Sequence, residues 1–326
     1  MTKIAINGLG RIGRAVFKIV LDTPELELVA INDLVPTDNL TYLLKYDTVY
    51  GKYQKQVDHS ENSLIIEGKE YKYFQEKNPE SLPWKELDID VVFECTGVFR
   101  QQEDLKKHLQ AGAKKVILSA PPKSEGIEVI VPGVSNGSTD NSSLISCASC
   151  TTNCIAPVME IAQRHLGVQK AVMTTIHAYT TSQGLVDQPS KKIRRGRAAA
   201  ANLVPTTTGA AIATTKVLPQ LENKFDGVAV RTPVPVGSIT DIVLVTEQKT
   251  SVEAVNQIFR QESQTERYQD ILGISEDQIV SSDIIGDSHA SVVDLTMTKV
   301  IDGDLVKIMS WYDNEWGYAN QMIREI

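Results

Sequence analysis

The feature that most constrains the fold is a glycine triplet between an apolar strand and an amphipathic helix. Lys3–Asn7 has the composition of a short strand and runs into Gly8, Gly10 and Gly13, which are spaced G-x-G-x-x-G. Arg14–Leu21 follows with apolar residues at helical spacing. A glycine triplet alone is a weak signal, but between a strand and a helix it predicts the phosphate-binding turn of a dinucleotide-binding domain.

Each glycine has a separate task in such a turn. Gly8 permits the tight turn, Gly10 lets a pyrophosphate approach the backbone, and Gly13 lets the helix and strand pack closely. The helix N-terminus adds free N–H groups and the positive end of its dipole. A second strand at Leu28–Asn32 ends at Asp33, twenty positions after Gly13. A carboxylate there accepts hydrogen bonds from ribose hydroxyls and repels a 2′-phosphate, which predicts NAD rather than NADP.

Further strands and helices alternate along the first half of the chain. Ile89–Phe93 and Lys115–Leu118 are apolar runs, and Asp104–Ala111 between them has helical spacing. This alternation predicts an α/β fold with a doubly wound parallel sheet of the Rossmann type. Ligands of such sheets bind outside the carboxyl ends of the strands. Three residues that follow strands are therefore expected to meet the cofactor: Thr96, Gly97 and Ser119.

The composition limits the remaining possibilities. A chain of 326 residues is long enough for about two domains, at roughly 150 residues each. Its net charge of −8 argues against nucleic acid as a partner, because a phosphate backbone requires a basic face. Four cysteines cannot form a disulfide scaffold, and a strand follows Met1 without a leader or a membrane span. We therefore expect a cytoplasmic protein with no membrane or nucleic-acid partner.

Three of the four cysteines crowd into eight residues, at Cys147, Cys150 and Cys154. Ser149 is a natural N-cap, which places Cys150 in the first turn of a helix. The positive end of the helix dipole is expected to lower the pKa of a thiol in that position. Cys154 lies one turn deeper, and we expect it to be packed and inert.

The chain then returns to the same place. A helix from Cys150 to about His165 carries it roughly 24 Å. The apolar run Ala171–Ile176 and His177 are seven extended residues, which bring it back roughly 23 Å. His177 is therefore expected beside Cys150, as in an activated nucleophile. Two alternatives remain, a redox pair at Cys147 and Cys150 or packed core cysteines. No second C-x-x-C and no suitable histidine spacing supports a metal site.

One dense basic run stands out in this acidic chain, at residues 191–197. Arginine suits bidentate binding of phosphate, so we assign Arg195 to anion binding. Lys191 and Lys192 are interpreted as a solvated loop. Farther along, Thr206–Thr208 precede Gly209 where a helix is able to begin, which provides hydroxyls and a free N–H for a second anion.

Several segments, in order and over essentially the whole chain, resemble glyceraldehyde-3-phosphate dehydrogenases. The segments that carry the resemblance are Asn7–Arg14, Leu44–Asp47, Ala148–Cys154, Thr175–Tyr179, Arg194–Ala200, Thr206–Ala211 and Trp311–Tyr318. The segment with the cysteines is specific to this family and to the related erythrose-4-phosphate dehydrogenases. The resemblance implies oxidation of glyceraldehyde 3-phosphate to 1,3-bisphosphoglycerate with NAD and inorganic phosphate, as in glycolysis and gluconeogenesis, by a homotetramer.

The resemblance also implies residue roles. Cys150 is the expected nucleophile, which forms a hemithioacetal and then a thioester, and His177 is the expected base. The attacking phosphate is held by Ser149, Thr151, Thr208 and Gly209. The phosphate of the substrate is held by Thr180 and Arg231, with Arg195 between the two anions.

For the cofactor, the resemblance implies that Asn314 bonds the nicotinamide carboxamide. Arg11, Ile12 and Asp33 hold the adenosine half and the pyrophosphate. Lys77 stands where the family often has an arginine against the adenine. A second departure is Cys147, where the family usually has asparagine. This thiol keeps open an NAD-responsive redox-sensing or binding protein, beside the alternative of an erythrose-4-phosphate dehydrogenase.

We expect two domains. Residues 1–149 form the NAD-binding domain, and residues 150–313 form an α+β catalytic domain. The runs Val228–Val230, Ile239–Glu247 and Leu305–Trp311 predict a mostly antiparallel sheet in the latter. The final helix, 314–326, is expected to pack back on the first domain.

Overall fold

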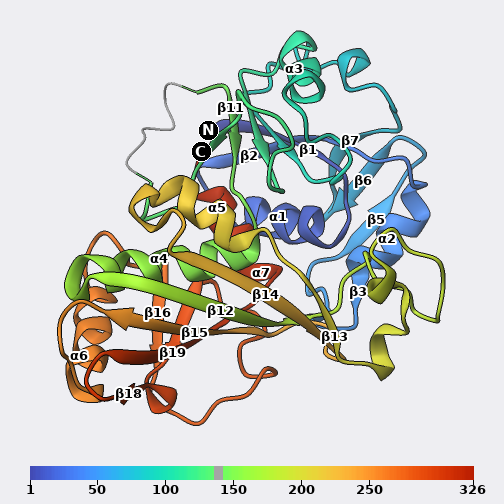
Figure 1. Ribbon diagram of the computed structural model, residues 1–326. Helices are drawn as coiled ribbons and strands as arrows, with labels where there is room; N and C mark the ends of the chain where they lie inside the picture. The colour runs from blue at the N-terminus through green and yellow to red at the C-terminus, as the bar shows by residue number, and fades with distance from the viewer. Residues whose placement is uncertain (136–141) are drawn as a thin grey trace. The chain divides into compact units, whose positions relative to one another are not determined.

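A computed structural model describes residues 1–135 and 142–326 (Figure 1). The chain divides into two compact units. The described residues of the first unit are 1–130, 142–148 and 322–326. The second unit comprises Val131–Ser135 and Ser149–Gln321. The functional division into domains at 149/150, with the final helix on the first domain, stays a prediction.

The first unit contains a mostly parallel sheet in the order β10-β11-β9-β8-β1-β2-β7-β6-β5. Neighbouring strands from β10 to β7 run parallel, and β5 and β6 add an antiparallel edge. Its strands are β1 (Thr2–Asn7), β2 (Leu26–Asn32), β5 (Val57–His59), β6 (Ser63–Ile66), β7 (Lys69–Phe74), β8 (Val91–Glu94), β9 (Lys115–Leu118), β10 (Glu128–Val129) and β11 (Leu144–Ser146). The predicted Rossmann class is confirmed.

Helices α1 (Arg11–Asp22), α2 (Thr37–Lys45) and α3 (Gln102–Gln110) complete the first unit, with a short pair β3 (Tyr46–Asp47) and β4 (Gly51–Lys52). Helix α1 packs against β1 and β2, and α3 packs against β9 and β11. Helix α1 begins at Arg11, earlier than the predicted Arg14, because Gly10 already serves as its N-cap. The sheet order reverses between β1 and β8, where sheets of this class hold their ligands.

The second unit contains a mixed sheet in the order β13-β14-β12-β15-β19-β17-β16, with β18 paired to β19. Most pairs are antiparallel, and β12–β14 and β16–β17 are parallel. The predicted largely antiparallel sheet is confirmed. Its strands are β12 (Val168–Ala178), β13 (Val204–Thr207), β14 (Phe225–Thr232), β15 (Ser238–Thr246), β16 (Leu272–Ser275), β17 (Ser291–Asp294), β18 (Lys299–Ile301) and β19 (Leu305–Tyr312).

Helix α4 (Cys150–Leu166) lies along this sheet and packs against β12, β15, β17 and β19 (Figure 1). Nearly all of its side chains up to Ala162 are buried, and α5 (Ala210–Val217) and α6 (Val252–Glu262) also pack against it. Helix α7 (Trp316–Ile323) ends the chain. Within the part of the chain that the structure describes, none of the helices has the length and apolar character of a membrane span.

Candidate active site and cofactor pocket

Helix α4 begins as its sequence predicts. The Ser149 hydroxyl accepts a hydrogen bond from the backbone N–H of Thr152 at 3.1 Å, which confirms Ser149 as the N-cap. Cys150 is the first helical residue and is half-buried. Its sulfur therefore lies beside the free N–H groups of the first turn.

Strand β12 leads back along α4 and delivers a histidine to that thiol. The Sγ of Cys150 lies 3.5 Å from Nε2 of His177. The predicted approach of these two residues is confirmed. A thiol and an imidazole within contact distance form the pair that nucleophilic catalysis by cysteine requires.

An arginine from the next strand lies behind the imidazole. Arg231 is the register partner of His177 in the parallel pair β12–β14, so both side chains project from the same face of the sheet. Its Nη1 lies 2.9 Å from both Nδ1 of His177 and the carbonyl oxygen of Ala178. The Nε of Arg231 is buried and has no hydrogen-bond partner among the described residues. This unpaired donor leaves the guanidinium ready for an anion.

The contacts of Nδ1 select a tautomer for His177. Nδ1 lies 2.7 Å from the carbonyl oxygen of Ala178, which only accepts, and 2.9 Å from Arg231, which only donates. One nitrogen cannot satisfy both neighbours. Donation from Nδ1 to the shorter contact avoids two facing lone pairs, and Arg231 then bonds the same carbonyl. Nε2 is left with its lone pair toward Cys150, as a base requires.

Burial changes the acid–base behaviour of this pair. Burial first, and then the charge of Arg231, lower the pKa of His177 to about 3, so the imidazole is neutral at physiological pH. Burial raises the pKa of the Cys150 thiol, although Arg231 and N–H donors at the helix start oppose this. The expectation of a lowered thiol pKa was wrong for this state, because the loss of hydration outweighs the helix dipole.

Tyr312 at the end of β19 completes the surroundings of the pair. Its hydroxyl lies 2.9 Å from the hydroxyl of Thr151 and 2.8 Å from that of Thr175, and its ring stands edge-on to His177 with centroids 5.9 Å apart. The sequence reasoning missed Tyr312, although it lies in a segment that carried the family resemblance. The hydroxyl of Thr151, which was predicted to bind phosphate, is hydrogen-bonded to Tyr312 in this structure.

The other two clustered cysteines differ from Cys150. Cys154 is fully buried, and burial raises the pKa of its thiol to about 11. Its sulfur lies 3.6 Å from the hydroxyls of both Thr240 and Ser291. Cys147 is also fully buried, and burial raises the pKa of its thiol well above the ordinary value. All four cysteines are free thiols, and the buried positions argue against a redox role for Cys147.

The predicted anion-binding groups lie on segments of the same unit. Nε of Arg195 bonds the hydroxyl of Thr206 at 2.9 Å, and its Nη2 bonds the carbonyl oxygen of Thr207 at 3.2 Å. Gly209 is the exposed N-cap of α5, and the Thr208 hydroxyl accepts from the first helical N–H at 3.2 Å. These contacts place Arg195 beside a helix start.

Thr180 and Asn314 make polar contacts near the end of β12, and the hydroxyl of Thr180 lies 2.9 Å from that of Ser182. The hydroxyl of Thr180 lies 3.5 Å from Nη1 of Arg231. Oδ1 of Asn314 accepts from the Ser238 hydroxyl at 2.9 Å, and the same hydroxyl accepts from the N–H of Ala178 at 3.1 Å. Ser238 therefore links the end of β12 to Asn314, a connection that the sequence did not reveal.

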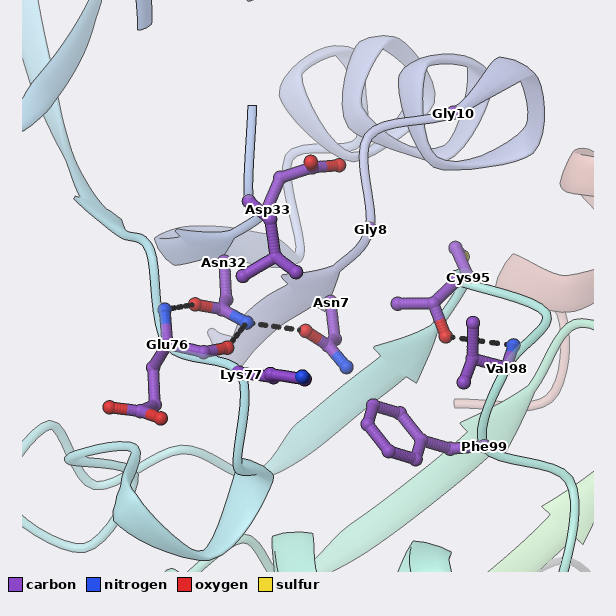
Figure 2. A pocket seen from close by; sticks show the side chains of 12 residues that line it. Asn7, Gly8, Gly10, Asn32, Asp33, Glu76, Lys77, Cys95, Val98 and Phe99 are labelled. Atoms are coloured by element: carbon purple, nitrogen blue, oxygen red, sulfur yellow. Dashed lines mark hydrogen bonds between the residues drawn. The ribbon is translucent and has the colours of Figure 1, made fainter. Parts of the chain in front are cut away.

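The first unit contains a cavity of about 520 Å³ outside the carboxyl ends of its strands (Figure 2). Its lining includes five predicted cofactor residues, Gly8, Gly10, Asp33, Lys77 and Thr96. The lining also includes residues that the sequence reasoning missed, namely Asn7, Asn32, Leu34, Glu76, Cys95, Val98 and Phe99. These residues lie at or shortly after the ends of predicted strands, and this position in the sequence could have identified them as pocket residues.

The glycines of the turn fit their predicted tasks. A Cβ at Gly13 would lie 1.9 Å from the carbonyl oxygen of Gly8, so only glycine permits this approach of helix and turn. Gly8 has φ +93°, and a Cβ there would lie 2.8 Å from the N atom of Thr96. A Cβ at Gly10 would meet nothing within 4 Å, so this position is open toward an approaching ligand.

Asp33 already has backbone partners. Its Oδ2 accepts from the N–H of Leu9 at 2.6 Å, and Oδ1 accepts from Val35 at 3.0 Å. These bonds hold the carboxylate at the pocket wall and leave it lone pairs for a ligand hydroxyl. Arg11, in contrast, pairs with Asp47 at 2.5 Å.

Ile12, Gly13, Gly97 and Ser119 are not among the residues that line this cavity in the described part of the chain. Gly97 has φ +70° in the loop after β8. An open glycine at a helix N-terminus, with the carboxylate of Asp33 bonded to the neighbouring Leu9 N–H, fits a dinucleotide. No cluster of metal-ligating side chains occurs within residues 1–135 and 142–326.

Comparisons with known proteins agree with both units. Residues 2–102 match the family "Glyceraldehyde 3-phosphate dehydrogenase, NAD binding domain", and residues 149–314 match "Glyceraldehyde 3-phosphate dehydrogenase, C-terminal domain". The chain is 49% identical to a glyceraldehyde-3-phosphate dehydrogenase of Thermotoga maritima, covering 99% of this chain and 97% of the relative. It is 46% identical to glyceraldehyde-3-phosphate dehydrogenase 2 of Streptomyces avermitilis, covering 98% and 96%.

Proposed function

Because the chain belongs to the glyceraldehyde-3-phosphate dehydrogenase family, we propose that Cys150 and His177 carry out its reaction. The activity is the NAD-dependent oxidation of glyceraldehyde 3-phosphate, a step of glycolysis. The observation that supports the residue assignment is the 3.5 Å contact between Sγ of Cys150 and Nε2 of His177 at the start of α4.

The reaction begins with a neutral pair. As Sγ attacks the aldehyde carbon, its proton moves to Nε2 of His177, whose lone pair faces the sulfur. The carbonyl oxygen becomes an oxyanion, which the backbone N–H of Cys150 and the imidazolium stabilise. The imidazolium of His177 then returns its proton to that oxyanion, and a neutral hemithioacetal results.

His177 next removes the hydroxyl proton of the hemithioacetal, while the hydride leaves the carbon and a thioester forms. NAD supplies the hydride acceptor when it is bound. An oxygen of inorganic phosphate then attacks the thioester carbon, and the thiolate leaves. The products are 1,3-bisphosphoglycerate and free Cys150, so the energy of the oxidation is conserved in the acyl phosphate.

Two sets of groups are proposed to hold the two phosphates. Arg231 and Thr180 bind the phosphate of the substrate, which is supported by the unpaired Nε of Arg231. Ser149, Thr151, Thr208 and Gly209 bind the attacking phosphate, with Arg195 between the two. For Thr151 this requires its hydroxyl to exchange Tyr312 for the anion.

The cofactor is proposed to lie along the turn after β1. Gly8, Gly10, Arg11, Ile12 and Gly13 hold the pyrophosphate, Asp33 the ribose and Lys77 the adenine edge. Thr96, Gly97 and Ser119 border the site at the ends of β8 and β9, and Asn314 bonds the nicotinamide carboxamide. The enzyme is proposed to be a cytoplasmic homotetramer. Sedimentation equilibrium tests the oligomeric state, and the expected mass is that of four chains.

One assay separates this function from its two alternatives. NADH formation is followed with glyceraldehyde 3-phosphate and with erythrose 4-phosphate, each with and without inorganic phosphate. Strong dependence on phosphate with the three-carbon substrate is expected. Indifference to phosphate with the four-carbon sugar would select an erythrose-4-phosphate dehydrogenase, and absence of turnover would select a redox-sensing or binding protein.

A further inference from the structure

A buried carboxylate lies beneath the cofactor pocket and is used by no step of the reaction. Glu94 is the last residue of β8, and its side chain has no exposed surface. Burying a carboxylate is costly unless its oxygens accept hydrogen bonds. The partners of Glu94 therefore show what this position is built to hold.

Each oxygen of Glu94 faces donors. Oε1 accepts from the backbone N–H of Thr96 at 2.8 Å and from the Thr96 hydroxyl. Oε2 lies 2.5 Å from Nδ2 of Asn7 and 3.2 Å from Nε2 of His108. Two of these three partners, Thr96 and Asn7, line the cofactor pocket. The carboxylate thus connects the pocket walls that follow β1 and β8.

A tryptophan orients the ring of His108 on α3 and selects its tautomer. The Trp84 indole N–H, which only donates, lies 3.0 Å from Nδ1 of His108. Nδ1 therefore accepts, the ring proton sits on Nε2, and Nε2 donates to Glu94. Both rings are fully buried and lie nearly parallel, at 20°. His108 therefore serves as a fixed hydrogen-bond donor to the carboxylate.

The network continues to the opposite wall of the pocket (Figure 2). Because Asn7 donates to Glu94, its Oδ1 faces outward and accepts from Nδ2 of Asn32 at 2.7 Å. Asn32 in turn bonds the backbone N–H of Glu76 at 2.8 Å and its carbonyl oxygen at 2.9 Å. The backbone of Glu76 fixes the amide of Asn32, and the contacts with Glu94 and Asn32 together fix the amide of Asn7.

From this arrangement we propose that Glu94, fixed by His108 and Trp84, is a positioning residue that holds Asn7 and Thr96 in the shape that receives NAD. The carboxylate cannot touch the cofactor, since it is fully buried. It acts through the two pocket residues that it orients. Its effect should therefore be on NAD affinity and not on the chemical step.

The first test replaces Glu94 by glutamine, which keeps the shape but turns an NH₂ group toward donors. We expect the Kd for NAD, measured by calorimetry, to rise about tenfold or more, with kcat at saturating NAD within about threefold of the parent. Ser63→Ala is the matched control, because it removes a buried hydroxyl of the same unit whose 2.6 Å contact is with Ser60, outside the pocket. Unchanged NAD affinity in folded Glu94→Gln would overturn the proposal.

A second pair of variants covers failure of that protein to fold. His108→Gln keeps a donor for Glu94, whereas His108→Leu has none. We expect the Kd for NAD of His108→Leu to exceed that of His108→Gln about fivefold or more. Equal Kd values in the two proteins would assign the network to stability alone. NAD binding is measured directly and needs no turnover. Either result is therefore independent of whether Cys150 and His177 are the catalytic residues.

Discussion

Nη1 of Arg231 lies 2.9 Å from Nδ1 of His177, while Nε2 on the other side of the same ring faces Cys150 at 3.5 Å. A fixed positive charge therefore stands behind the base and opposes its protonation. The same charge favours the thiolate of Cys150. An anion bound to Arg231 would weaken both effects.

Removal of that charge should be visible in the thiol. In Arg231→Gln, loss of the cation is expected to shift the pH midpoint for alkylation of Cys150 by iodoacetamide upward, because Arg231 lowers the pKa of this thiol. The kcat/KM for glyceraldehyde 3-phosphate should fall about a hundredfold or more with loss of the phosphate partner. Arg194→Gln, in the exposed part of the basic run, is the control. A midpoint unchanged in Arg231→Gln would contradict this account.

The nucleophile has a direct test. Cys150→Ser should reduce turnover to below a few per cent of the parent, because a hydroxyl is far less nucleophilic than a thiol or thiolate. NAD binding should remain nearly unchanged, since the cofactor cavity is lined by residues of the first unit. Steady-state NADH formation and calorimetric titration with NAD provide the two measurements. Retention of substantial turnover would remove Cys150 from its proposed role.

Two glycines of the same turn should respond differently to alanine. Gly13→Ala forces a Cβ to 1.9 Å from the carbonyl oxygen of Gly8, so the Tm should fall and NAD binding should fail. Gly10→Ala meets no protein atom within 4 Å, so its Tm should stay near that of the parent while NAD affinity falls about tenfold or more. Thermal unfolding and NAD titration of both proteins check this difference. Equal Tm losses would argue against it.

The pH dependence of stability has one identifiable contributor in Glu325. This side chain is 5% exposed, and burial raises the pKa of its carboxyl from 4.5 to about 7. The folded chain therefore keeps a proton that the unfolded chain releases above pH 4.5, and the free energy of unfolding falls as pH rises toward 7. The loss amounts to about 3 kcal/mol at most for a shift of this size.

Glu325→Gln should remove that contribution. Its free energy of unfolding, measured in urea at a series of pH values between 4.5 and 8, is expected to fall less steeply with pH than that of the parent. Glu61→Gln, at an exposed carboxyl of the same unit, is the control for a general change of charge. Parallel pH profiles for parent and Glu325→Gln would exclude Glu325 as the source.

Cys147 is expected to take no part in the oxidation of this protein by peroxide. Its thiol is fully buried and burial raises its pKa, so it lacks the thiolate that peroxide attacks. Cys147→Asn and the parent are therefore expected to lose activity at the same rate in hydrogen peroxide. Slower or less reversible inactivation of the variant would revive the redox alternative for Cys147 and Cys150.

The elements were predictable where local chemistry decides the structure. The glycine spacing, the Ser149 cap and the apolar periodicity identified the turn, the helix start and the strands. The return of β12 beside α4 followed from the lengths of the two elements. These features depend on neighbours in sequence, which a single chain displays directly.

The missed features depend on contacts between distant segments. Tyr312 reaches Thr151 and Thr175 across the sheet, and Glu94 meets His108 and Asn7 from three separate elements. The prediction of a lowered pKa for Cys150 was wrong for the same reason. The helix dipole is local and was visible in the sequence, whereas burial by the rest of the unit was not.

The pairing of β12 with β14 has a consequence for how such a chain can diverge. His177 and Arg231 sit opposite each other because two strands are in register, and 53 residues separate them in the sequence. Insertions or deletions in the intervening loops leave that alignment untouched. A slip of one residue within either strand would instead separate the two side chains onto opposite faces. Changes of length in this connection are therefore tolerable only away from its proposed phosphate-binding residues, whereas the two strands must keep their register.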